Sequence, residues 1–391
     1  MSALASAMPR LRRSAQLGAE RARGREFDIA FYMPWIGPLL VPGAGPPPGG
    51  AETQMLMLAR ALAGRGRRVC LVTYGTAGVL PTEIDGIAVI AQRPPRTRVK
   101  LVGFATHLVS AARALGPLRA NVFVQRAAGP TTGIVALFAR AKRSRFVYSS
   151  ANVIDFDFER LEASRPRVWL FHLGLKLANT IVVQTHEQVD LCRRRFGRDP
   201  VLIKSIAEPA STTELDRQAF LWVGRAAPYK RPDAFVDLAA AVPEASFRMI
   251  LVTPERGHAL TRSVVERCRK VPNIELLDPR PREELMRLID SSVAMVNTAD
   301  FEGMPNIYLE SWARGVPALS LLHDPDGVIE RESLGFFARG SPERLAAHAR
   351  TLWQTRANQS ELQARCRAYV AREHGPEQVV DRWVEALGLH P

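Results

Sequence analysis

The chain has 391 residues, of which 47% are hydrophobic and 24% are charged, as in folded globular proteins with about two domains. This composition excludes an intrinsically disordered, collagen-like or coiled-coil protein. Lys and Arg outnumber Asp and Glu by 53 to 39, but only six of the 53 are Lys, so the net charge of +14 alone identifies no partner.

Residues 1–25 are expected to be a mobile basic leader. They do not read as a secretory signal, because no apolar run follows their arginines. The longest uncharged stretch, residues 29–51, contains six prolines, which a membrane-spanning helix does not tolerate. The four cysteines form no CxxC pair and no Cys/His cluster with metal-ligand spacing. We therefore expect reduced thiols, no bound metal and a cytoplasmic protein.

Residues 26–205 alternate β-branched or aromatic runs with helical patterns, which predicts a Rossmann-like, doubly wound α/β domain with a parallel sheet. The predicted strands are 27–33, 68–73, 121–125, 145–148 and 180–184. A loop rich in Pro and Gly ends at Gly50, and a helix is predicted over residues 51–63.

A polar linker, residues 206–217, separates this domain from a second Rossmann-like domain over residues 218–365. Its predicted strands are 218–224, 247–252, 273–277, 293–296 and 317–321. Residues 341–387 are expected to form consecutive helices, and those of the C-terminal stretch 366–391 can pack back on the first domain. We expect the two sheets to face each other across a cleft, with ligand at the carboxyl ends of the strands.

The most specific segment follows the fourth strand of the second domain. It places Glu302 on a loop, the amides of Asn306 and Ile307 at a helix N-terminus, and Glu310 inside that helix. Such amides suit a phosphate, and ionised carboxylates accept hydrogen bonds from sugar hydroxyls or from the diol of a ribose. Alternatively, Glu310 pairs with Arg314 four residues later and Glu302 only caps the helix.

The first strand of the second domain ends in Gly224 and is followed by Arg225, Lys230 and Arg231. A planar guanidinium and a compact ammonium together suit a diphosphate whose charge grows as a bond to it breaks. The alternative is that these cations are solvated surface residues.

Gly49 and Gly50 open a helix directly after the first strand of the first domain, and Glu52 follows them. The glycines allow backbone to approach a ligand closely. The spacing is not GxGxxG, and no suitably placed acidic residue follows, so nicotinamide dinucleotide binding is not indicated. A tight turn is the alternative.

Together, in this order and on these two domains, the three segments resemble family 4 glycosyltransferases of the GT-B fold, a likeness that covers about residues 27–385. Its Glu-x7-Glu motif corresponds to Glu302 and Glu310. The Gly-Arg strand end followed by Lys and the Gly-Gly-x-Glu helix entry are both present.

The resemblance implies a retaining transfer from a nucleotide sugar, most simply a UDP- or GDP-sugar, with no metal. In it the leaving phosphate takes the acceptor's proton, and no protein nucleophile is needed. The implied catalytic residues are Arg225, Lys230 and Glu302. The implied donor-binding residues are Gly224, Gly303, Met304, Asn306, Ile307 and Glu310, with the base against Leu277 and Asp278. The loop of Gly49 and Gly50 would close the site from the acceptor side.

One feature departs from the family. Many members have a His at a strand end of the first domain, and this chain has none there. Arg126, Asn152 and Asp155 remain as acceptor-side candidates, although each can equally be a structural loop residue.

A basic region, residues 86–154, contains no acidic side chain. Within it a helix is predicted over residues 99–115, with a broad apolar face. That face comprises Leu101, Val102, Phe104, Ala105, Leu108, Val109 and Ala112. Such a surface suits an anionic membrane leaflet or a lipid-diphosphate-linked acceptor. The alternative is a core-facing helix with solvated arginines, and nucleic acid is not expected because no aromatic-interleaved basic motif is present.

We therefore expect a glycosyltransferase that modifies a glycan or lipid-linked acceptor in polysaccharide or glycolipid assembly, at the inner face of the cytoplasmic membrane. A sugar-phosphate synthase or epimerase on the same fold is one alternative. A catalytically silent scaffold that binds membrane or polymer is another.

Overall fold

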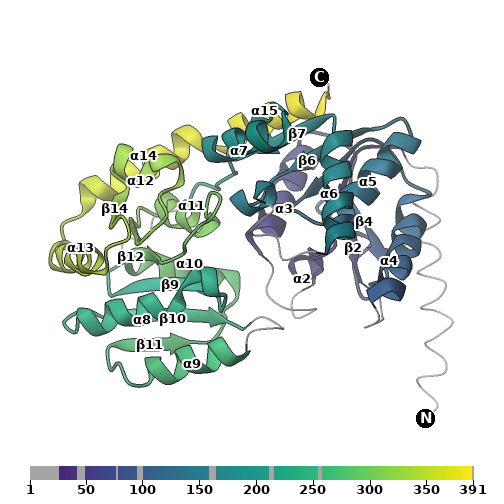
Figure 1. Cartoon of the computed structure of the whole chain (residues 1–391). Coiled ribbons are helices and arrows are strands. Elements are labelled where there is room, and N and C mark those ends of the chain that lie inside the picture. The colour runs from purple at the N-terminus through teal and green to yellow at the C-terminus, as the bar shows by residue number, and fades with distance from the viewer. Residues whose placement is uncertain are drawn as a thin grey trace, which may run out of the picture. The chain divides into compact units, whose positions relative to one another are not determined.

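The computed structural model describes residues 26–41, 49–75, 78–94, 100–157, 164–210, 215–253 and 258–389, without the side chains of residues 100–105. The chain forms two compact units (Figure 1). The first contains Met1–Ile203 and Val379–Pro391, and the second contains Lys204–Gln378. The stretch 206–217, which we predicted as a linker, belongs to the second unit.

The first unit is built on an eight-stranded sheet in the order β3-β4-β2-β1-β5-β6-β7-β8, in which only the β3–β4 pair is antiparallel. Its strands are β1 (Glu26–Tyr32), β2 (Val69–Tyr74), β3 (Glu83–Ile84), β4 (Ile87–Gln92), β5 (Arg119–Arg126), β6 (Arg145–Ser149), β7 (Thr180–Val183) and β8 (Val201–Leu202). The five predicted strands are confirmed, whereas β3, β4 and β8 were not predicted. The sheet grows in one direction from β1 to β4 and in the other from β5, so its topological switch point lies between β1 and β5.

Helices cover both faces of this sheet, which is why its strands are nearly continuous apolar runs. They are α2 (Gly37–Leu40), α3 (Gly50–Gly64), α4 (Lys100–Leu115), α5 (Pro130–Ala141), η1 (Val153–Phe156), α6 (Arg165–Leu177) and α7 (His186–Phe196). Right-handed crossovers place α4, α5 and α6 on one face, where Figure 1 shows them as neighbours.

Helix α4 buries one side and exposes part of the predicted apolar face. His107, Ala111 and Leu115 are buried, whereas Leu108 and Val109, two members of the predicted apolar face, are exposed. His107 can be buried because its Nδ1 lies 2.8 Å from the Tyr74 hydroxyl. Ala112 is exposed too, and the predicted apolar side chains of residues 101–105 lie outside the described part.

The second unit contains a six-stranded, wholly parallel sheet in the order β11-β10-β9-β12-β13-β14. Its strands are β9 (Ala219–Arg225), β10 (Phe247–Val252), β11 (Ile274–Leu277), β12 (Ser292–Asn297), β13 (Ala318–Ser320) and β14 (Gly335–Phe337). Only β14 was not predicted. The order reverses after β11, so the switch point of this sheet lies between β9 and β12.

The helical elements of the second unit are η3 (Pro228–Lys230), α8 (Pro232–Ala241), α9 (His258–Cys268), α10 (Arg282–Asp290), α11 (Asn306–Ala313), η4 (Pro325–Gly327), α12 (Val328–Arg331), α13 (Pro342–Thr355) and α14 (Ser360–Glu373). In the described ranges, no helix combines the length and the apolar character needed to cross a bilayer. No group of three metal-ligating side chains occurs among the described residues.

The last helix, α15 (Pro376–Leu387), packs largely with the first unit. Its Trp383 is buried, the carbonyl of Ala386 accepts a hydrogen bond from Thr180 Oγ1 at 3.3 Å, and Asp381 lies 2.5 Å from Arg65. The C-terminal residues thus complete a unit that begins near the N-terminus.

Residues at the start of the second unit are bonded to residues at the end of α14. His374 Nδ1 donates to the carbonyl of Ser205 at 2.7 Å, and the carbonyl of His374 accepts from the Ala207 amide at 3.0 Å. Lys204 forms an ion pair with Glu373. This ion pair and the neighbouring Arg372 lower the pKa of Glu373 to about 2.

The buried His374 predicts an acid-dependent loss of stability. Burial lowers the pKa of His374 from 6.5 to about 4. Between pH 4 and pH 6.5 the unfolded chain therefore binds more protons than the folded chain. Stability is therefore complete above pH 6.5 and falls as the pH drops to 4, by roughly 3 kcal/mol at 1.36 kcal/mol per pKa unit. We expect urea unfolding of the wild type to show this loss and His374→Gln to show a flatter profile. Parallel profiles would contradict the assignment.

Candidate active site

The loops that follow β9 and β12 meet at the switch point of the second sheet. Lys230, on the β9 loop, forms an ion pair with Glu302, on the β12 loop. Glu302 is buried and Lys230 is half-buried, so solvent screens this pair less than a surface pair. The structure thus brings together two of the three predicted catalytic residues.

A buried hydroxyl fixes the Lys230 loop against β12. Thr298 Oγ1 lies 2.8 Å from the carbonyl oxygens of both Lys230 and Arg231, and it accepts a hydrogen bond from Trp222 Nε1 at 3.0 Å. Arg231 has φ of 47°, a left-handed conformation that is strained for a side chain other than Gly. Sequence reasoning did not identify Thr298, because a Thr after an apolar strand carries no distinctive signal.

Aromatic and backbone contacts join the same two loops. The rings of Tyr229 and Phe301 stack with centroids 5.0 Å apart, and the Asp300 amide donates to the Tyr229 carbonyl at 2.8 Å. Lys230 Nζ also lies 5.6 Å from the Tyr229 ring centroid, within the range of a cation–π contact. These contacts hold the ammonium and the carboxylate in position before any ligand binds.

Gly224 and Arg225 end the central strand β9 as predicted. A Cβ on Gly224 would lie 2.8 Å from the Trp222 ring, so a larger residue would displace the indole that holds Thr298. Arg225 is exposed, and it forms no ion pair with any residue in the described ranges. Its guanidinium is therefore available to an anionic ligand at the carboxyl edge of the sheet.

Helix α11 begins directly after Glu302. Its N-cap, Pro305, makes no side-chain capping bond, and Asn306 and Ile307 form its first turn. His323 Nε2 lies 3.0 Å from the carbonyl oxygen of Gly303 and so anchors the loop before the helix. Met304 is buried beside it. The N-terminus of α11 thus offers a phosphate site on a fixed loop, and His323 is a positioning residue that the sequence did not reveal.

Glu310 lies on the next turn of α11 and forms an ion pair with Arg282 at 2.7 Å. The expected alternative partner, Arg314, instead pairs with Asp290 at 3.2 Å. The other alternative, that Glu302 merely caps α11, also fails to describe the structure, since the Glu302 carboxylate is paired with Lys230.

Leu277 ends β11, and Asp278 is exposed just beyond it. Because all strands of this sheet are parallel, both lie at the same carboxyl edge as Arg225 and Glu302. No described contact joins them to the Lys230–Glu302 pair, so their role at a nucleotide base stays a prediction.

The predicted residues of the first unit lie in three places: the loop after β6, the start of α3 and the end of β5. Asn152 Oδ1 accepts the Ile154 amide at 3.4 Å and caps η1, and Asp155 Oδ2 accepts hydrogen bonds from Tyr148 Oη, Ser150 Oγ and the Ala151 amide. Gly49 is the N-cap of α3, with Gly50 as its first residue. Arg126 is buried at the end of β5. Asn152 and Asp155 are thus hydrogen-bonded close to their own positions, whereas Arg126 makes one hydrogen bond among the described residues, to Ser149 Oγ. The acceptor-side role of these three residues stays a prediction.

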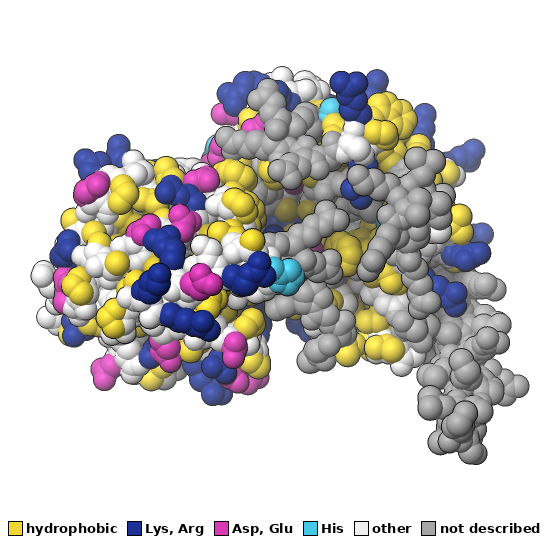
Figure 2. All heavy atoms as spheres, turned by 60° about the horizontal axis from the view of Figure 1, so that its bottom comes forward, with side chains coloured by type: hydrophobic (Ala, Val, Ile, Leu, Met, Phe, Trp, Pro, Cys, Tyr) yellow, Lys and Arg dark blue, Asp and Glu magenta, His cyan; other side chains and the backbone are white. Residues whose placement is uncertain are grey.

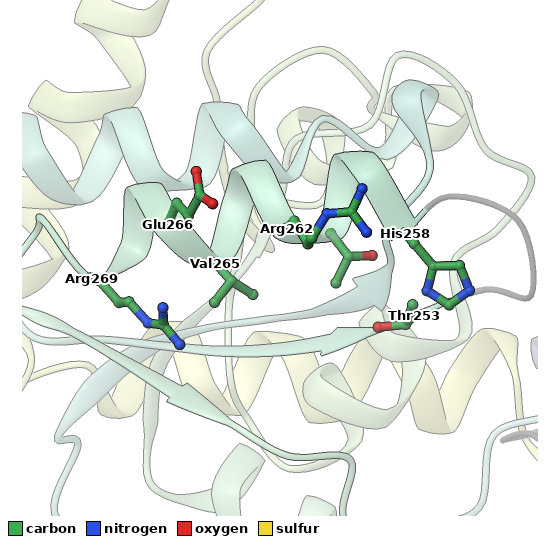
Figure 3. Close-up of a pocket in the computed structure, with 7 residues that line it drawn as sticks. Thr253, His258, Arg262, Val265, Glu266 and Arg269 are labelled. Carbon is green, nitrogen blue, oxygen red and sulfur yellow. The ribbon is translucent and has the colours of Figure 1, made fainter.

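A cavity of about 320 Å³ lies along α9 (Figure 3). Its lining residues are Thr253, His258, Thr261, Arg262, Val265, Glu266 and Arg269. Figure 3 shows His258 and Thr253 together at one end of the helix and Arg269 at the other. None of these residues was predicted as part of the site.

Two family models match the chain. The model of the glycosyl transferase 4-like domain matches residues 49–206, and that of glycosyl transferases group 1 matches residues 217–355. The chain is a glycosyltransferase of the family 4 type. In this glycosyltransferase the first match lies within the first unit except for its last three residues, and the second match lies within the second unit.

Solved structures confirm the GT-B fold of the glycosyltransferase. A sucrose-phosphate synthase from Thermosynechococcus elongatus matches with a TM-score of 0.75 and 14% identity over 91% of this chain and 97% of its own. WaaG, a glycosyltransferase involved in lipopolysaccharide biosynthesis, matches with a TM-score of 0.65 and 15% identity over 90% of this chain and 99% of its own.

TarM of S. aureus, solved with fondaparinux, α-GlcNAc-glycerol and UDP, is longer than this glycosyltransferase. It matches with a TM-score of 0.58 and 13% identity over 68% of this chain, which spans 55% of its length. At these identities the likeness shows the fold, and the ligands belong to the neighbours.

Proposed function

We propose that this protein is a retaining glycosyltransferase that moves a sugar from a UDP- or GDP-sugar to a glycan or lipid-linked acceptor in polysaccharide or glycolipid assembly. The observation that carries the donor half of the proposal is the Lys230–Glu302 pair at the switch point, directly before the N-terminus of α11. Cation, carboxylate and helix amides are the groups that a sugar diphosphate requires.

In the proposed reaction, Lys230 and Arg225 neutralise the charge that develops on the leaving diphosphate, which is the main stabilisation such a transition state needs. Glu302 accepts hydrogen bonds from sugar hydroxyls and orients the ring, and Glu310 exchanges Arg282 for the ribose diol. The leaving phosphate takes the acceptor's proton. The proposal includes no metal ion, and activity that disappears in excess EDTA would contradict that part.

Thermal unfolding with UDP, GDP, ADP and NAD tests the donor site. A ligand at a hundred times its Kd stabilises the folded protein by about 2.7 kcal/mol. We expect one nucleoside diphosphate to raise the Tm of the wild type, NAD to have no effect, and Glu310→Gln to reduce the response. Absence of a shift with every nucleotide would favour a silent scaffold instead.

The acceptor half of the proposal places the protein at an anionic membrane surface on the cytoplasmic side. Four large apolar side chains are exposed on the neighbouring helices α4, α5 and α6: Leu108 at 37%, Val109 at 50%, Leu137 at 46% and Trp169 at 64%. The same three helices carry four exposed arginines: Arg113, Arg140, Arg165 and Arg167. They contain no acidic residue. In Figure 2 the described part of the first unit shows mainly dark blue and yellow spheres. A Trp flanked by cations suits a lipid headgroup boundary.

Vesicle sedimentation tests the membrane surface. We expect binding to vesicles with 30% phosphatidylglycerol to weaken as salt rises and to fall several-fold in Trp169→Ser, because an apolar anchor and screened charge attraction both contribute. Leu276→Ser is the matched control, since Leu276 is exposed at 39% on the second unit. Equal loss in both variants, or affinity independent of salt, would overturn the membrane part of the proposal.

A further inference from the structure

Arg126 is a buried cation at the topological switch point of the first sheet. It is the last residue of β5, next to β1, and only 7% of it is exposed. A guanidinium has five N–H donors. Among the described residues it makes one hydrogen bond, from Nη1 to Ser149 Oγ at 3.3 Å, and its buried Nε has no partner.

No carboxylate of the described residues lies within ion-pairing distance of this guanidinium. Asp155, the carboxylate whose charge affects Arg126 most, accepts three hydrogen bonds at Oδ2, from Tyr148 Oη at 2.9 Å, Ser150 Oγ at 3.1 Å and the Ala151 amide at 2.7 Å. This oxygen of Asp155 is therefore already bonded to residues 148–151 and not to Arg126. Burial lowers the pKa of Arg126 to about 10, and the charges of Asp155 and Glu52 only partly oppose this shift.

A buried charge without a bonded counter-ion is costly, and proteins keep such groups chiefly where a ligand supplies the missing partner. The location supports this reading, because ligands of doubly wound sheets bind at the carboxyl ends of the strands beside the switch point. Glu52 does not fill the role: its carboxylate leans back over the N-terminus of α3, where a Cβ on Gly49 would lie 2.8 Å from Oε2.

We propose that Arg126 binds an anionic group of the acceptor, a phosphoryl group or a carboxylate, and thereby selects charged acceptors over neutral ones. The inference rests on the proposed function, since it assigns the acceptor to the first unit. The planar guanidinium suits two oxygens of one phosphoryl group at once. A lipid-linked diphosphate and a free sugar phosphate both supply this group.

Calorimetric titration of inorganic phosphate and of UDP into four proteins tests the proposal. They are the wild type, Arg126→Gln, Lys230→Gln and the control Arg194→Gln, which removes an exposed Arg of the same unit. We expect Arg126→Gln to bind phosphate at least tenfold more weakly while its UDP affinity is unchanged. Lys230→Gln should show the reverse pattern, and Arg194→Gln should match the wild type.

The outcomes separate the two proposals. Phosphate binding that is absent from the wild type or unaffected in Arg126→Gln would overturn the Arg126 site, whatever UDP does. UDP that fails to bind the wild type would overturn the donor site and leave the phosphate result to decide on Arg126.

A purely structural Arg126 predicts a different pattern. Replacing an unpaired buried cation should leave the Tm unchanged or raise it, whereas breaking a structural network should lower it. If Arg126→Gln does not fold, Arg126→Lys keeps the charge but loses the two-point geometry and should weaken phosphate binding several-fold. Normal phosphate affinity in Arg126→Lys, together with a lowered Tm in Arg126→Gln, would contradict the proposal.

Titrations with farnesyl diphosphate and with glucose 6-phosphate distinguish the two sources of the anion. We expect one of these two compounds to bind the wild type more tightly than inorganic phosphate does. In Arg126→Gln its affinity should fall to that of inorganic phosphate. Farnesyl diphosphate as this probe would point to a lipid-linked acceptor, and glucose 6-phosphate to a free phosphorylated sugar. Neither probe depending on Arg126 would overturn the role in acceptor selection.

Discussion

Lys230→Ala should lower kcat for sugar transfer by about a hundredfold or more, because a single preorganised donor that meets developing charge is typically worth that much. In the wild type the ammonium is held by the ion pair with Glu302 and by the Tyr229 ring, so it needs no rearrangement of its loop to act. Initial rates with saturating donor measure the effect.

Two controls separate chemistry from folding. Lys270→Ala removes an exposed lysine of the same unit and should leave kcat unchanged. Because Lys230→Ala leaves a buried Glu302 without its partner, its Tm must be measured, and Lys230→Ala/Glu302→Gln should restore any lost stability without restoring kcat. Near-normal turnover of folded Lys230→Ala would remove this residue from the mechanism.

Trp312→Ala should lower the free energy of unfolding of the second unit by about 3–5 kcal/mol, the usual cost of truncating a buried Trp. Trp312 is fully buried on α11, stacked on Tyr308 at 5.1 Å and edge-on to Tyr369 at 5.6 Å. Because these rings fix the helix that bears Glu310, affinity for a nucleoside diphosphate should fall as well. Urea unfolding and UDP titration measure the two effects.

Trp169→Ala is the matched control for stability, since 64% of Trp169 is exposed and such substitutions change the free energy by roughly 0.5 kcal/mol or less. Trp312→Phe keeps most of the buried ring and should recover most of the lost stability. A Trp312→Ala protein as stable as Trp169→Ala would show that α11 is fixed by other contacts.

Local sequence patterns identify candidate site residues where these residues lie close together along the chain. Glu302 and Glu310 lie on one loop and its helix, and Arg225 and Lys230 follow one strand, so local patterns suffice to locate them. The structure adds that Lys230 and Glu302, 72 residues apart, form an ion pair. That pairing depends on β9 and β12 being neighbours, which follows from the order of the strands rather than from any motif.

Residues that act across the fold could not be predicted. Thr298, His323 and Arg282 hold the Lys230 loop, the Gly303 carbonyl and the Glu310 carboxylate, but each is an isolated polar residue in its own segment. The same limit applies to His107 on α4, which is buried with its Nδ1 2.8 Å from the Tyr74 hydroxyl, a contact that no local pattern indicates. The short strands β3, β8 and β14 have only two or three residues each, too few for a period of two to be recognised.

The position of α15 has a consequence for synthesis on the ribosome. The first unit includes the residues of α15 from Val379 onward, which are translated after the whole of the second unit, Lys204–Gln378. The first unit can therefore bury Trp383 only after the second unit has been synthesised, whereas the second unit can fold earlier. Nascent chains arrested before residue 379 should expose the β7 surface that α15 covers, and would be the form most readily bound by chaperones.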